Sequence, residues 1–153
     1  MSIWDDRMKN DYRALQKLCV FYEPEKIKIL EKQGEPPNFY RLQISNCKGI
    51  EAVVDGSVQY RTEHILIIRN FPVDYPAPGS LPDFEMETLI FNPHVLLGRV
   101  ISFFCFDIVH LDTLVKQVLD LIKYKKDDWG RGSPCNHAAR KWAETNKYLF
   151  PLE

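Results

Sequence analysis

Cys105 is the residue whose surroundings raise a chemical question. It follows a segment in which prolines recur at positions 72, 76, 78, 82 and 93. Because each proline fixes one backbone dihedral and removes an N–H donor, we expect stiff, irregular coil there. A cysteine thiolate is a strong nucleophile that can carry an acyl group as a thioester. The apolar run "SFFCFDI" around Cys105, taken by itself, favours instead a buried and unreactive thiol.

Two polar side chains near Cys105 are candidates for a supporting role. An amine that attacks a thioester passes through an oxyanion, which a donor must meet at about 2.7–3.1 Å. Asn92 and His94, on either side of Pro93, can both donate a hydrogen bond. For His94, a histidine that faces solvent or braces the loop is an equally good interpretation. His110 could tune the pKa of the thiol, although its position just before a predicted helix favours a structural role.

A metal site is a weaker alternative. Cys135 and His137 could be imagined around zinc together with His110, but Cys-x-His is not a usual ligand spacing. A loop that leads into a helix explains these residues more simply. We therefore expect no metal and no other cofactor.

Composition excludes several classes of function. The chain has 153 residues, with 20 Lys and Arg against 21 Asp and Glu and a net charge of −1, so binding to nucleic acid or anionic lipid is not expected. The longest apolar stretches, Ile65–Ile68 and Val100–Phe106, are far shorter than a membrane span, and the amino terminus is charged. The 4 cysteines show no CxxC spacing. These features predict a single cytoplasmic domain, residues 1–153, with reduced thiols.

Three helices are expected from hydrophobic periodicity. The first carries an apolar stripe near the amino terminus, formed by Trp4, Met8, Tyr12, Leu15 and Cys19. The second begins near Asp112, the predicted N-cap, and its stripe consists of Leu111, Leu114, Val115, Val118, Leu119 and Ile122. A last helix within residues 136–150 has small residues for close packing, namely Ala138, Ala139 and Ala143.

Strands are expected between the first two helices. Alternating or β-branched runs cover residues 39–45, 50–54, 64–69 and 82–88, and residues 27–30 could add a short strand before them. Because the runs are separated by short turns, the predicted fold class is α+β. It consists of a four-strand antiparallel meander with an N-terminal helix and C-terminal helices.

The chain resembles the ubiquitin-conjugating enzyme family. Members carry Phe-Pro-x-x-Tyr-Pro, a strand, His-Pro-Asn, a glycine, and the catalytic cysteine in Cys-Leu-Asp-Ile. The corresponding segments here are Phe71-Pro72-Val73-Asp74-Tyr75-Pro76, Asn92-Pro93-His94, Gly98 and Cys105-Phe106-Asp107-Ile108. The sequence is most similar to bacterial relatives that accompany ubiquitin-like proteins or cyclic-nucleotide synthases in antiphage defence operons.

The resemblance implies a site and a reaction. Cys105 would accept the C-terminal glycine of a modifier from an activating enzyme and pass it to a target lysine. The family's His-Pro-Asn asparagine stabilises the oxyanion or holds the loop that does so. Here Asn92 and His94 are exchanged around Pro93, so His94 stands at that asparagine's position.

Two departures from the family pattern change these expectations. The stretch between Pro93 and Cys105 is longer than usual, and alignment on Gly98 would put Ile101 at the catalytic position and describe an inactive variant. We prefer alignment on Cys-x-Asp-Ile, because an insertion in a loop costs little. Ala77 follows Pro76, and the Trp-Ser-Pro segment of eukaryotic members is absent, so no RING ligase partner is expected.

Two hypotheses on function follow. In the first, the protein is an acyl transferase of bacterial antiviral defence that carries a ubiquitin-like protein or a cyclic-nucleotide synthase as a thioester on Cys105. In the second, it is a catalytically inactive member of the fold that binds a modifier or scaffolds a complex.

Overall fold

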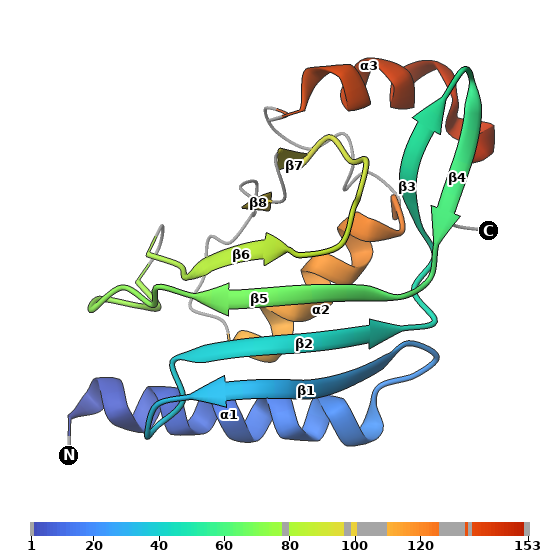
Figure 1. Ribbon diagram of the computed structural model, residues 1–153. Helices are drawn as coiled ribbons and strands as arrows, with labels where there is room; N and C mark the ends of the chain where they lie inside the picture. Colours follow the sequence, from blue (N-terminus) through green and yellow to red (C-terminus); the bar gives the residue numbers. More distant parts are fainter. Residues whose placement is uncertain are drawn as a thin grey trace.

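A computed structural model describes residues 2–77, 80–96, 99–100, 110–125, 134 and 136–151, with side chains left aside at 99 and 100. Helices begin and end the described chain, and the strands lie between them (Figure 1). In chain order the elements are α1 (Ile3–Phe21), β1 (Lys26–Gln33), β2 (Phe39–Ser45), β3 (Gly49–Val54), β4 (Ser57–Arg61), β5 (His64–Arg69), β6 (Asp83–Met86), β7 (Val95–Leu96), β8 (Arg99–Val100), α2 (Leu111–Ile122), α3 (His137–Thr145) and a 3₁₀ turn (Lys147–Leu149).

The main sheet is antiparallel and has the strand order β1-β2-β5-β6-β8-β7. In the centre of the sheet, Tyr40 lies opposite Ile68 and Leu42 opposite Leu66, and all four side chains are buried. Since side chains of a strand alternate between its faces, this register gives the sheet one buried face.

Helices α1 and α2 cover that buried face, behind the sheet in Figure 1. Met8, Leu15 and Leu18 of α1 pack into the same core as the sheet. The apolar stripe predicted for α2 is buried along its whole length. The fold class is confirmed: an N-terminal helix, an antiparallel sheet and C-terminal helices.

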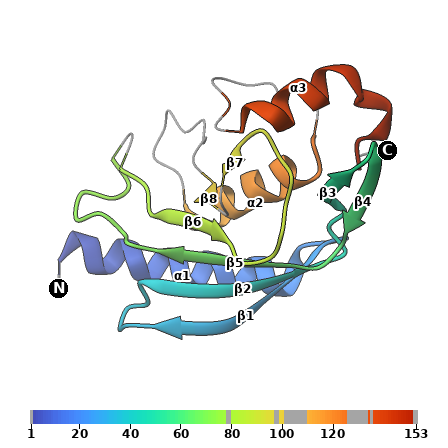
Figure 2. The ribbon, with the colours of Figure 1, turned by 45° about the horizontal axis from the view of Figure 1, so that its top comes forward.

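A second, smaller core lies apart from the sheet. Strands β3 and β4 form a separate hairpin beside α3, away from the amino terminus (Figure 2). The hairpin and α3 enclose a cluster around Ile50, Tyr124 and Ala143. Ala139 and Ala143 are buried, as the close-packing argument requires, whereas Ala138 is exposed.

Two sequence-based expectations need correction. Residues 50–54 were expected within the meander, but among the described strands they form a ladder with Ser57–Arg61, because the turn at Asp55-Gly56 returns the chain on itself. Asp112 is not the N-cap of α2. That position belongs to His110, whose side chain makes no capping hydrogen bond, while Asp112 lies in the first turn.

Within the described residues, α1, α2 and α3 are all too short or too polar to cross a lipid bilayer.

Candidate functional site

The proline-rich coil after β5 is fixed to α1 and the sheet. Tyr75 is buried, and its ring meets that of Phe71 edge-on at 5.3 Å between centroids. The Trp4 Nε1–H donates to the Pro72 carbonyl oxygen at 3.2 Å. Residues 71–77 and 80–82 form turn and coil, as their prolines predicted. This part of the coil is therefore held by both aromatic packing and a hydrogen bond.

Asp11 joins the coil to both helices. Asp11 is only 1% exposed, and its Oδ2 accepts a hydrogen bond of 2.5 Å from the Tyr75 hydroxyl. The other oxygen, Oδ1, lies 3.2 Å from both Arg7 Nε and His110 Nδ1 and 3.4 Å from the backbone nitrogen of Leu111. Burial and the adjacent carboxylate raise the pKa of Tyr75, so its hydroxyl remains a donor.

Asp11 also provides a hydrogen-bond acceptor at the amino terminus of α2. The first N–H groups of a helix have no partner within the helix, and His110 does not cap them with its side chain. Asp11 supplies an acceptor to Leu111 from another helix. A buried carboxylate of α1 thus fixes where the chain enters α2, directly after residues 101–109.

The Asn92-Pro93-His94 turn is buried and held from within. Asn92 and His94 are both 0% exposed. The Asn92 Oδ1 accepts from the His94 backbone N–H at 3.0 Å, and its Nδ2 donates to the Leu121 carbonyl oxygen at 2.6 Å. Asn92 therefore uses both ends of its amide on the backbone, and it ties the turn to the last turn of α2.

Asn136 holds the turn from the other side. It is the N-cap of α3, where its side-chain oxygen accepts from Ala139. Its backbone N–H donates to the Pro93 carbonyl oxygen at 3.0 Å, and its Nδ2 donates to the Val95 carbonyl oxygen at 3.4 Å. The carboxyl end of α2 and the amino end of α3 thus meet at this turn.

The structure brings only part of the predicted site together. Asn92 and His94 lie in one turn, and His110 lies at the start of α2 beside Asp11. Cys105 and the alternative position Ile101 lie outside the described residues, in the stretch between β8 and His110. Gly98, Asp107 and Ile108 lie outside them as well.

The two described thiols are poor nucleophiles. Burial raises the pKa of Cys47 to about 12, because a thiolate is not solvated in the core. Cys19 is half-buried, and burial raises its pKa too. Neither thiol is in an electropositive, accessible setting of the kind that activates cysteine.

Metal ligands do not gather in the described part of the chain, where no group of three His, Cys, Asp or Glu side chains is placed to hold an ion. Cys135, from the zinc alternative, lies outside the described residues.

Asp11 and Asn136 had no assigned role in the sequence-based site. A signal for Asp11 was present, since it lies three residues after Met8 and four before Leu15, within the apolar stripe of α1. A charged residue on that stripe must be buried and therefore must be paired. Asn136 precedes the last predicted helix, which is a capping position, but its contact with residues 93–95 depends on the tertiary fold.

Comparison with known proteins supports the fold assignment. No protein-family model matches the chain, and no curated protein matches it. One similar solved structure is described as "Ubiquitin conjugating enzyme (putative) from Trypanosoma cruzi"; it is 19% identical, the alignment covers 93% of this chain and 90% of that chain, and the TM-score is 0.62. The chain therefore has the fold of ubiquitin-conjugating enzymes.

Proposed function

We propose that this protein is a conjugating enzyme that carries a modifier as a thioester on Cys105 and transfers it to a lysine. The observation that carries the proposal is the restraint of the chain on both sides of residues 101–109. Before them, Asn92 ties its turn to α2. After them, Asp11 fixes the entry into α2 at Leu111. Restraint of this kind keeps reacting groups in register and so lowers the entropic part of a barrier.

Two acyl transfers make up the reaction. In the first, the Cys105 thiolate attacks the modifier's thioester on an activating enzyme, and that enzyme's thiolate leaves. In the second, a lysine amine attacks the carbonyl carbon of the new thioester. The tetrahedral oxyanion collapses, the Cys105 thiolate leaves, and the amine's proton passes to solvent.

Asn92 and His94, the two residues exchanged around Pro93, have different proposed roles in this reaction. Asn92 is the positioning residue, because both ends of its amide already serve the backbone. His94 is then the candidate oxyanion donor. The modifier is a ubiquitin-like protein or a cyclic-nucleotide synthase in bacterial antiviral defence, and we propose that transfer in the cytoplasm needs no RING ligase.

A non-catalytic binding module is the second candidate. It is favoured by the complete burial of both Asn92 and His94 and by the apolar neighbours of Cys105. Such a protein would use the same fold to hold a modifier or a partner without forming a covalent bond.

Variants of Cys105 distinguish the two candidates when a cognate activating enzyme and modifier are supplied. Cys105→Ser should replace a thiol-labile adduct by a slower, thiol-resistant ester, whereas Cys105→Ala should give none. Cys47→Ala is the matched control and should retain the labile adduct. An adduct that survives Cys105→Ala would overturn the assignment of Cys105 as the carrier. An adduct that never forms would favour the binding module instead.

A further inference from the structure

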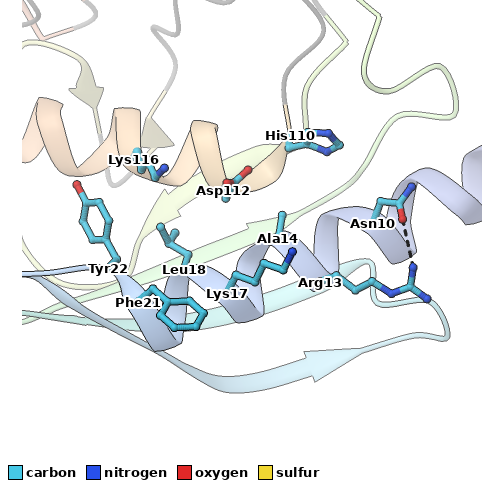
Figure 3. A pocket seen from close by; sticks show the side chains of 10 residues that line it. All are labelled: Asn10, Arg13, Ala14, Lys17, Leu18, Phe21, Tyr22, His110, Asp112 and Lys116. Carbon is cyan, nitrogen blue, oxygen red and sulfur yellow. Dashed lines mark hydrogen bonds between the residues drawn. The ribbon is translucent and has the colours of Figure 1, made fainter.

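A groove lies between α1 and α2. Figure 3 shows side chains of both helices along it, with His110 at one end and Phe21 and Tyr22 towards the other. Its volume is about 610 Å³. Ala14 and Leu18 supply its apolar part, and Leu18 is buried.

The rim of the groove is positively charged. Arg13, Lys17 and Lys116 line it, and among the described residues none of the three forms an ion pair. Arg13 donates to the Asn10 side-chain oxygen at 3.4 Å, and Lys116 lies 5.9 Å from the centre of the Tyr22 ring. A cluster of cations without carboxylate partners attracts an acidic ligand.

Other arginines of the chain differ from Arg13 in that they pair with carboxylates. Five other arginines with described side chains pair with carboxylates: Arg7 with Asp11, Arg41 with Glu87, Arg61 with Glu51, Arg69 with Glu85 and Arg140 with Glu144. The chain carries a net charge of −1, so a general excess of positive charge does not explain the groove.

Asp112 favours a peptide over a simple anion as the ligand of the groove. It also lines the groove, and its Oδ1 is buried and has no hydrogen-bond partner among the described residues. A buried acceptor of this kind needs an N–H donor. A simple anion such as phosphate has acceptors for Arg13 and Lys17, but it would be repelled by Asp112. A peptide offers both carboxylates and N–H groups.

The apolar surface also fits a peptide. Phe21, at the end of the groove, is 78% exposed, which is high for a large aromatic side chain. An apolar side chain of a bound peptide would cover Leu18 and Ala14 and would shield the Phe21 ring from water.

We propose that the groove between α1 and α2 binds an acidic peptide segment of a partner protein. Carboxylates of the segment pair with Arg13, Lys17 and Lys116, an N–H group donates to Asp112, and an apolar side chain packs on Leu18. The proposal does not depend on Cys105, and it holds equally for an enzyme and for a binding module.

The test is an NMR titration of the ¹⁵N-labelled Cys105→Ala protein, which removes any thioester chemistry. The probe is an acetylated, amidated peptide of alternating Glu, Leu and Asp residues, compared with its Gln and Asn counterpart and with inorganic phosphate. We expect the acidic peptide alone to shift resonances of α1 and α2 around the groove. The affinity should fall as salt rises, because exposed charges are screened.

Charge reversal at the rim provides the control. Arg13→Glu combined with Lys17→Glu should weaken peptide binding by about tenfold or more, since two attractions become repulsions. Lys28→Glu with Lys32→Glu changes the net charge equally on β1 and should leave the affinity nearly unchanged. A well-dispersed spectrum confirms that each variant is folded. The proposal is overturned if phosphate shifts the same resonances and the peptide does not, if neither does, or if the rim variant binds as tightly as the parent.

Discussion

The Tyr75 hydroxyl donates a 2.5 Å hydrogen bond to Oδ2 of Asp11, which lies 64 residues earlier in the chain. Asp11 is 1% exposed and Tyr75 is 3% exposed, so the bond is shielded from water. A buried carboxylate is tolerated only where donors surround it. Here the donors come from α1, from the coil after β5 and from the start of α2, and one side chain therefore sets the positions of three segments.

Replacement of Asp11 by alanine should destabilise the protein strongly. The change leaves the partly buried Arg7 and the buried Tyr75 hydroxyl without this acceptor, and breaking a buried pair costs about 3–5 kcal/mol. Urea unfolding followed by circular dichroism measures the loss. Asp6→Ala, on an exposed position of the same helix, is the control and should change the free energy of unfolding by no more than about 0.5 kcal/mol. Equal effects of the two variants would mean that the network is not stabilising.

Asn92→Ala should also destabilise the fold, because it removes two hydrogen bonds at one buried turn. The Leu121 carbonyl and the His94 backbone N–H lose their described side-chain partners, at a cost of about 1–3 kcal/mol for each group. The free energy of unfolding measures this loss. Asn38→Ala, at an exposed position just after the turn between β1 and β2, is a suitable comparison. An unfolding free energy that matches that of the Asn38 variant would contradict the bracing role.

The helices and most strands follow from local patterns, because their burial repeats with the period of each structure. The stripe from Leu111 to Ile122 is buried as its spacing predicts, and Tyr40, Leu42 and Ile44 alternate inward on β2. The place of residues 50–54 does not follow from such a pattern. The alternation of buried and exposed residues along a strand does not predict which strand it pairs with. Here the turn at Asp55 and Gly56 pairs β3 with β4.

In the candidate site, too, some features follow from local sequence and others depend on the tertiary fold. The proline spacing predicts the irregular coil, and the exchanged residues around Pro93 can be read directly from the sequence. The contacts of Asp11 with Tyr75, and of Asn92 with Leu121, join residues far apart in the chain and depend on packing of whole elements. Local sequence therefore predicts the coil and the exchanged pair, whereas the contacts of Asp11 and Asn136 emerge only from the tertiary fold.

His64 should make stability depend on pH. It is 1% exposed, and its Nε2–H donates to the Cys47 carbonyl oxygen at 2.7 Å, while Nδ1 is buried with no hydrogen-bond partner among the described residues. Burial lowers the pKa of His64 below its usual value of 6.5. Between the lowered and the usual pKa, the unfolded chain binds a proton that the folded chain does not bind.

Stability should therefore fall as the pH drops below the unfolded pKa, and it should be fully present above it. Unfolding free energies at about pH 8 and pH 5.5 measure the effect. In His64→Gln, which retains an N–H donor but does not titrate, the fall should be smaller. A pH dependence identical to that of the parent protein would assign the effect to other groups.

The reactivity of the thiols should separate sharply in the native protein. With a pKa of about 12, Cys47 is almost entirely protonated at pH 8 and is also buried, so it should react with a thiol reagent only on unfolding. In a Cys19→Ala, Cys135→Ala background, only Cys47 and Cys105 remain. We expect one rapid modification, which Cys105→Ala abolishes. Rapid modification that persists in that variant would show that Cys47 is accessible.

His94→Ala should slow transfer to lysine more than it slows loading of Cys105. In the proposed reaction, an amine attacks during transfer, and the oxyanion formed then is the one that His94 would meet. Loss of an oxyanion donor typically lowers a rate by about 10²–10³-fold. Single-turnover assays measure the two steps separately, first with the activating enzyme and then with purified thioester and a lysine acceptor. Asn92→Ala is the comparison, and it should impair both steps alike because it loosens the turn as a whole. If His94→Ala slows both steps equally, the histidine braces the turn, and the oxyanion donor must be sought elsewhere.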